Sequence, residues 1–235
     1  VNMSYMGSEN FPKGKRFGYF PAFSAGWIAS NEDFLQGNNA VSFLKLRASY
    51  GLTGNDLIGG PRFMFDQLFP FGASPYFGTG NNSTGGLSEG TPANPDVTWE
   101  KEIKMNIGVE ATFIDRIQFS LDVFKNKRKH ILAQPFFTVP QYVGVDLPFL
   151  NVAKVDNKGL EAVIGYHNTP GGAVQWFVEG NAAYARNKIT YNAEAVQEDT
   201  YLYRSGQPAG QPFGLEAIGF FRDQADIDSS PRQIF

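Results

Sequence analysis

Polar and apolar residues alternate along residues 97–113, which read VTWEKEIKMNIGVEATF. From Trp99 to Phe113 the odd positions are apolar except for Lys101, and the even positions are charged, polar or glycine. A period of two residues is that of a β-strand, whose successive side chains point to opposite faces. The pattern lasts roughly three times as long as the usual strand of 5–6 residues, as a bilayer-crossing strand does. We therefore expect Trp99 and Phe113 near the two membrane interfaces, where aromatic rings gather.

The same alternation recurs along most of the chain and predicts an all-β fold of about seven antiparallel strands, with an eighth possible at 213–221. The seven predicted strands lie near residues 1–6, 17–29, 42–53, 97–113, 117–127, 158–167 and 174–187. A soluble barrel or sandwich turns its apolar face inward, whereas a membrane barrel turns it outward. The period alone therefore does not choose between these two architectures.

The lengths of the connections favour the membrane barrel. Residues 114–116 and 168–173 are short enough for hairpin turns. Residues 55–96 form a long stretch rich in Gly, Pro, Asn and Ser, and 128–157 are predicted to form another. Short turns on one side and long loops on the other are typical of outer-membrane barrels.

Composition removes several function classes. The chain has 235 residues with a net charge of -3, and 15% of its residues are aromatic. It has no cysteine, so disulfides, thiolate catalysis and cysteine metal sites are excluded. No run of about 18 apolar residues predicts a transmembrane helix. The basic stretch Lys13–Arg16 is too short to indicate a nucleic-acid partner.

Catalytic and metal-binding signals are weak as well. The chain contains two histidines, His130 and His167, and neither has the spacing of a general base or a metal-ligand pair. We therefore expect no enzyme activity, no metal site and no cofactor.

The long segment 55–96 carries the candidate binding residues, because it places many aromatic rings in a loop that should otherwise be polar. Aromatic rings can stack on sugars or clamp a peptide, and nearby asparagines can donate and accept hydrogen bonds. The candidate substrate-contact residues are Arg62, Phe63, Tyr76, Phe77, Asn81 and Asn82. The alternative is that the rings pack the loop on itself or against a partner protein.

Four blocks of the sequence resemble the SusC/RagA family of TonB-dependent outer-membrane transporters. They read RFGYFPAFSAGWIASNEDFL, VSFLKLRASYGLTGND, NPDVTWEKEIKMNIGVEATFIDRIQFSLDVFKNKRKHIL and GQPFGLEAIGFF. The resemblance implies a large transmembrane β-barrel, which closes at about 22 strands in this kind of transporter. Residues 1–235 would then be a segment of one barrel domain, roughly a third of it, without the plug domain and the closing strands.

The resemblance also implies a function. It is the energised import of a nutrient such as an oligosaccharide or peptide across the bacterial outer membrane. The expected partners are the lipid bilayer, a SusD-like surface lipoprotein that lids the barrel, and TonB, which would act through parts not in this chain. The rival hypothesis is a soluble or surface-exposed β-sandwich for adhesion or binding, which would turn its apolar faces inward.

Overall fold

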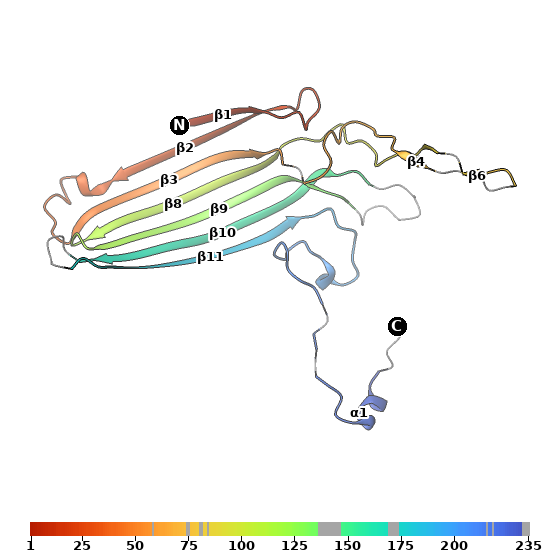
Figure 1. The fold of residues 1–235 in the computed structure, drawn as a ribbon. Helices are drawn as coiled ribbons and strands as arrows, with labels where there is room; N and C mark the ends of the chain where they lie inside the picture. The colour runs from red at the N-terminus through yellow and green to blue at the C-terminus, as the bar shows by residue number, and fades with distance from the viewer. Residues whose placement is uncertain are drawn as a thin grey trace.

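A computed structural model describes most of the chain. The described residues are 1–57, 59–73, 76–79, 82–83, 85–135, 147–168, 174–214, 216–217 and 219–231, with the backbone alone at 73, 76, 77, 82 and 83. Within this part, six long strands and the shorter β1 form one antiparallel sheet in the order β1-β2-β3-β8-β9-β10-β11 (Figure 1). The strands are β1 (Asn2–Gly7), β2 (Phe17–Ile28), β3 (Val41–Asn55), β8 (Glu100–Phe113), β9 (Ile117–Ala133), β10 (Leu150–His167) and β11 (Phe177–Tyr191).

The two ends of the sheet differ in their connections. At one end β8 and β9 are joined by residues 114–116, where Ile114 and Asp115 have φ angles of 52° and 54°. Both angles are positive, as a tight hairpin turn of type I′ requires. At the other end, which we call the loop end, residues 56–99 connect β3 to β8 and extend beyond the sheet (Figure 1). These two connections show the predicted asymmetry, whereas residues 29–40 at the turn end and residues 8–16 at the loop end are intermediate in length.

The short elements lie outside the sheet. The long loop contains two small ribbons, in which β4 (Phe71–Ala73) pairs with β7 (Gly86–Leu87) and β5 (Tyr76–Phe77) pairs with β6 (Asn82–Ser83). The helical elements in the described residues are short: η1 (Ala29–Asn31), η3 (Thr200–Leu202) and α1 (Gln224–Ser229). No helix in the described part of the chain is long and apolar enough to span a membrane.

Strand register separates the two faces of the sheet. Ile107 of β8, Val123 of β9 and Ile164 of β10 lie on one face and are 69%, 54% and 57% exposed. The opposite face carries polar rows such as Arg47, Gly108 and Asp122, which lie directly across from one another on β3, β8 and β9. A sandwich would bury the apolar face under a second sheet, and the described residues form one long-stranded sheet with that face open. The structure thus supports the barrel segment over the sandwich.

Buried residues gather in a small cluster at the loop end. Phe11, Phe20, Val97 and Trp99 form it, with Leu52, Met64, Phe65 and Leu132 packed around them. The Phe20 and Trp99 ring centroids are 5.3 Å apart and the rings meet edge to face. A Cβ on Gly54 would lie 2.1 Å from the Phe20 ring, so glycine is needed where this ring meets β3. The cluster anchors the base of the long loop to the sheet.

The predicted interface position of Trp99 is therefore wrong. β8 begins at Glu100, one residue later, and Trp99 is only 4% exposed. Its indole Nε1 donates to the Arg16 carbonyl oxygen at 3.2 Å, and its ring packs against Phe11 at 5.2 Å. The alternating pattern continues through Trp99 in the sequence, but a loop that is distant in the sequence supplies its packing partners. Phe113, by contrast, ends its strand beside the turn and is partly exposed.

Two further predictions are also wrong. Residues 128–157 are not one long loop, because β9 continues to Ala133 and β10 begins at Leu150. These extensions mix polar and apolar side chains on both faces, and the pairing of β10 with β9 shifts register between Asn151 and Val155, so the alternation is lost there. Residues 213–214, 216–217 and 219–221 form no strand. Alternation is not sufficient there, because a strand also needs a neighbour for its backbone hydrogen bonds.

Candidate functional site

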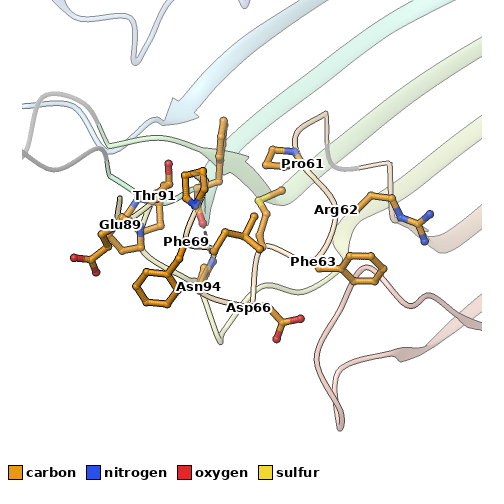
Figure 2. A pocket seen from close by; sticks show the side chains of 15 residues that line it. Pro61, Arg62, Phe63, Asp66, Phe69, Glu89, Thr91 and Asn94 are labelled. Atoms are coloured by element: carbon orange, nitrogen blue, oxygen red, sulfur yellow. Dashed lines mark hydrogen bonds between the residues drawn. The ribbon is translucent and has the colours of Figure 1, made fainter. Parts of the chain in front are cut away.

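A pocket of about 830 Å³ lies at the loop end of the sheet. Its walls come from three segments that are distant in sequence, and most of the lining is apolar or aromatic. The fifteen lining residues are Pro61, Arg62, Phe63, Met64, Asp66, Leu68, Phe69, Pro70, Glu89, Gly90, Thr91, Pro92, Asn94, Pro148 and Phe149. Figure 2 shows Arg62 and Phe63 on one side of the pocket and Phe69 and Glu89 on another.

The first wall is a tight turn that presents an aromatic ring and a cation together. The Asp66 backbone N–H donates to the Phe63 carbonyl oxygen at 2.9 Å, and Phe63 has a φ of 60°, which is uncommon for a residue with a side chain. The Arg62 guanidinium lies 5.0 Å from the centroid of the Phe63 ring. Its Nε also donates to Asn10 Oδ1 at 3.2 Å. This cation–π contact and hydrogen bond hold the guanidinium at the pocket rim.

The second wall is a two-stranded backbone contact within the long loop. The Gly90 N–H donates to the Leu68 carbonyl oxygen at 3.0 Å, and the Ser88 N–H donates to the Pro70 carbonyl oxygen at 3.0 Å. A Cβ on Gly90 would lie 2.9 Å from the Leu68 carbonyl oxygen, so a larger residue would push the strands apart. Gln67 braces the same wall, because its Oε1 accepts from the Ala93 N–H at 2.9 Å. These hydrogen bonds set the backbone positions from which Phe69 and Glu89 line the pocket.

Asn94 joins the three segments. It is buried, and its Nδ2 donates to the Phe149 carbonyl oxygen at 2.7 Å. Its Oδ1 accepts from the Asp96 N–H at 2.9 Å, and its own N–H donates to the Met64 carbonyl oxygen at 2.7 Å. A buried amide with both polar ends satisfied fixes the chain segments around it. Asn94 therefore determines where the third wall, residues 148–149, meets the other two.

The candidate substrate-contact residues predicted from the sequence lie in two different places in the structure. Arg62 and Phe63 lie together in the pocket wall. Tyr76, Phe77 and Asn82 belong to the separate β5–β6 ribbon, and their side chains lie outside the described part of the structure. Asn81 lies outside the described residues altogether. Substrate contact by these residues stays a prediction.

The pocket also contains residues that the sequence reasoning missed. Asp66 and Glu89 place two carboxylates in its wall, opposite in charge to Arg62. Asn94 stands in the stretch TPANPD, where the prolines on both sides point to a fixed turn that could have been noticed. Nothing in the sequence indicates that Phe149 joins the pocket, because its wall is formed by a second loop.

The aromatic rings of the long loop differ in how they pack. Phe65 packs against the buried cluster and contacts Phe63 edge to face, with a centroid distance of 6.1 Å. Phe63 and Phe69 line the pocket and remain 40% and 58% exposed. Packing of the loop is thus observed for Phe65, whereas substrate contact by the exposed rings stays a prediction.

Below the pocket, the polar face of the sheet carries a network of ion pairs. The Arg47 guanidinium lies 2.9 Å from Glu110 Oε1 and 2.5 Å from Asp122 Oδ2. Glu102 lies 3.6 Å from Arg128 Nη2 and 3.8 Å from the Lys104 ammonium. This face can offer charged and hydrogen-bonding groups to a wet interior, while the apolar face can contact lipid.

Comparisons with known proteins agree with this architecture. Residues 3–231 match the family model described as TonB dependent receptor-like, beta-barrel. The chain is 28% identical over 230 residues to TonB-dependent receptor P3 of Formosa agariphila, covering 92% of this chain and 22% of that protein. It is 27% identical over 209 residues to TonB-dependent receptor SusC of Bacteroides thetaiotaomicron, covering 85% of this chain and 20% of that protein. The chain thus spans about a fifth of the length of these relatives.

The fold is similar to that of a solved importer. The structure of the RagAB peptide importer in its closed-closed state superposes with a TM-score of 0.67 at 23% sequence identity. The match covers 80% of this chain and 20% of that one. The family model, the relatives and the shared fold lead to one conclusion: the chain belongs to the TonB-dependent receptor-like β-barrel family of the bacterial outer membrane.

Proposed function

We propose that this chain forms a section of the barrel wall of a receptor that imports a nutrient, an oligosaccharide or a peptide, across the outer membrane. In this proposal the pocket at the loop end contacts the nutrient as it arrives from outside. The name of the RagAB peptide importer supports a transport role for a protein of this fold.

The observation that carries the proposal is the placement of the pocket at the loop end of a two-faced sheet. Long loops mark the extracellular end of an outer-membrane barrel. The pocket there combines exposed phenylalanine rings with one guanidinium and two carboxylates. Apolar walls with a few polar groups are typical of a site for a small solute. Both oligosaccharides and peptides have apolar surfaces and hydrogen-bonding groups that match such a lining.

The partners belong to the proposal as well. A SusD-like lipoprotein would cover the loop end, and TonB would supply energy through parts of the receptor other than the wall described above. The plug domain of the receptor would fill the interior that the polar face lines. The chemistry of import requires no bond to be made or broken in the solute, so we propose no catalytic residue, metal or cofactor.

The test uses the full-length receptor produced in outer membranes. Replacing Phe63 and Phe69 together by alanine removes both exposed rings of the pocket. We expect uptake of the nutrient to fall about fivefold or more, because contacts of a single ring contribute roughly 0.5–1.5 kcal/mol. Uptake is measured with defined peptides and with defined oligosaccharides, so that the same experiment identifies the substrate class.

The matched control is Phe71→Ala, since Phe71 is an exposed ring of the same loop that does not line the pocket. Barrel yield in the membrane should equal that of the wild type in every variant. A Tyr76→Ala, Phe77→Ala double variant tests the second pair of candidate rings. Uptake that is unchanged in both double variants, at normal yield, would disprove nutrient contact by this loop.

A further inference from the structure

The outward, apolar face of the sheet carries a group of unpaired cations near the loop end, which we call the basic belt. It comprises Lys101 on β8, Lys125, Lys127 and Lys129 on β9, Lys158 on β10, and Arg186 and Lys188 on β11. Register places all of them on the face of Ile107 and Val123, because each lies directly across from another residue of that face. The neighbouring strands β8 to β11 run side by side in Figure 1. The belt is therefore one continuous patch.

The belt contains like charges in direct opposition. Lys125 lies across from Lys158, which in turn lies across from Arg186. Lys101 lies across from Lys129. Like charges at directly opposite positions of an antiparallel pair destabilise the sheet. An anion from outside the chain would remove this repulsion.

The described part of the chain does not supply that anion. No belt residue makes an ion pair or a side-chain hydrogen bond in the described part of the structure. Asp156 is the carboxylate that shares this face, opposite Lys127 and Lys188, and it pairs with neither. On the inward face of the same strands, Lys104 and Arg128 both pair with Glu102. Inward cations are thus neutralised, and outward cations are not.

The height of the belt identifies its surroundings. From Ile117 at the turn end to Lys125, β9 rises by eight residues, or about 26 Å at roughly 3.3 Å per residue. A strand tilt of about 40° reduces this rise to about 20 Å, close to the apolar band of about 25 Å that surrounds outer-membrane barrels. The outward side chains of this stretch, such as Phe119 and Val123, are apolar. The belt therefore lies at the headgroup level on the loop side of the membrane.

The belt is restricted to one part of the wall. On β1 and β2 the outward positions near the loop end are aromatic, with Tyr5 stacked on Phe17 at 5.1 Å and tilted against Tyr19 at 4.5 Å. Aromatic rings are found at membrane–water interfaces in general, whereas a cluster of ammonium and guanidinium groups can form charge-assisted hydrogen bonds with a phosphate.

We propose that the basic belt binds the phosphate groups of a phosphorylated glycolipid in the outer leaflet of the outer membrane. The lysine and arginine side chains donate to phosphate oxygens while the lipid chains lie against the apolar face below. The bound lipid offsets the repulsion within the belt and fixes the height of this wall section in the membrane. The site is separate from the pocket for the nutrient, and rests on the outward orientation of the apolar face.

The experiment uses the full-length receptor in detergent, with bisphosphorylated lipid A and its dephosphorylated form as the two probes. The belt variant carries Lys125→Gln, Lys158→Gln and Arg186→Gln, which neutralise one cross-strand row. We expect the wild type to bind the phosphorylated probe at least about tenfold more tightly than the other, and the belt variant to lose at least about tenfold of that affinity. Native mass spectrometry counts the bound lipid, and heat-modifiable gel mobility reports the folded barrel.

The control neutralises as many cations elsewhere, with Lys13→Gln, Arg204→Gln and Arg222→Gln, and should bind as the wild type does. A second variant, Lys125→Arg with Lys158→Arg, keeps the charge and should also bind. Wild-type affinity should fall as salt rises, because phosphate contacts are electrostatic. Equal binding of both probes, wild-type binding by a folded belt variant, or affinity independent of salt would each overturn the proposal. Since no nutrient is present, failure here leaves the proposed import untouched.

Discussion

The buried amide of Asn94 offers the most direct test of how the pocket is built. Asn94→Ala removes the hydrogen bond to the Phe149 carbonyl oxygen and the one accepted from the Asp96 N–H. It leaves both partners without the groups that satisfied them, and the backbone bond to Met64 remains. Losing two such bonds at a buried position should cost the local structure roughly 2–4 kcal/mol. Opening of this part of the loop then becomes about 30-fold to 1,000-fold more frequent.

Amide hydrogen exchange of the full-length receptor measures this opening directly. We expect faster exchange in residues 94–98, where the Asp96 N–H loses its acceptor. The strands β8 and β9 should exchange as in the wild type, because none of their ladder bonds involves Asn94. Nutrient uptake should also fall, since the wall formed by residues 148–149 loses its tie to the long loop.

A second substitution separates the two bonds. Asn94→Asp keeps an oxygen that can accept from the Asp96 N–H, but it removes the donor to the Phe149 carbonyl oxygen. Exchange at Asp96 should therefore stay slow in Asn94→Asp while the pocket loses affinity. The control is Asn39→Ala, at an exposed asparagine in the connection between β2 and β3. Wild-type exchange at Asp96 in Asn94→Ala would refute the assignment of Asn94 as the residue that joins the walls.

Two further predictions concern the sheet. Gly108→Val should displace the Arg47 guanidinium, because a Cβ there would lie 2.7 Å from Asp122 Oδ1 and 2.9 Å from Arg47 Nε. The free energy of unfolding should fall by about 1–2 kcal/mol, since the ion pair is partly exposed, and the urea midpoint should fall with it. The same substitution should have a smaller effect in a receptor that already carries Arg47→Gln. Ile107→Lys should make the free energy of folding into lipid vesicles less favourable by roughly 2–4 kcal/mol. The reason is that this exposed side chain lies on the apolar face, which we expect to contact the middle of the bilayer. Asn106→Lys on the inward face is its control, and equal costs for the two lysines would contradict the assignment of the faces.

Much of the fold follows from the sequence, because side chains alternate with a period of two residues. Once Ile107 is placed on one face, the faces of its neighbours on β8 are fixed, and the register of β9 then places Val123 beside it. The all-β class and the seven strands of one antiparallel sheet are confirmed by the structure, and so is the long connection between β3 and β8. The free edges of β1 and β11 in the described sheet are those of a barrel segment.

What the sequence could not provide depends on contacts between distant segments. Trp99 continues the alternation of its strand, but Phe11 and Arg16 draw it into a buried cluster. The ends of β9 and β10 mix polar and apolar side chains on both faces, and register shifts between Asn151 and Val155 interrupt the period of two, so their pattern resembles a loop. The sequence indicates only part of the pocket lining, because Phe149 belongs to another loop and is held at the pocket by the hydrogen bond from Asn94 to its carbonyl oxygen.

The distribution of charge gives the wall section its orientation. Lys104 and Lys125 lie on adjacent strands near the loop end, but on opposite faces. Lys104 has Glu102 within 3.8 Å, whereas Lys125 faces Lys158 across the next strand pair. If both faces of the sheet were in contact with water, we would expect the inward and outward cations to be paired with carboxylates to a similar extent. The difference follows if the inward face must neutralise its charges within the protein, while the outward face can rely on the anions of the membrane surface.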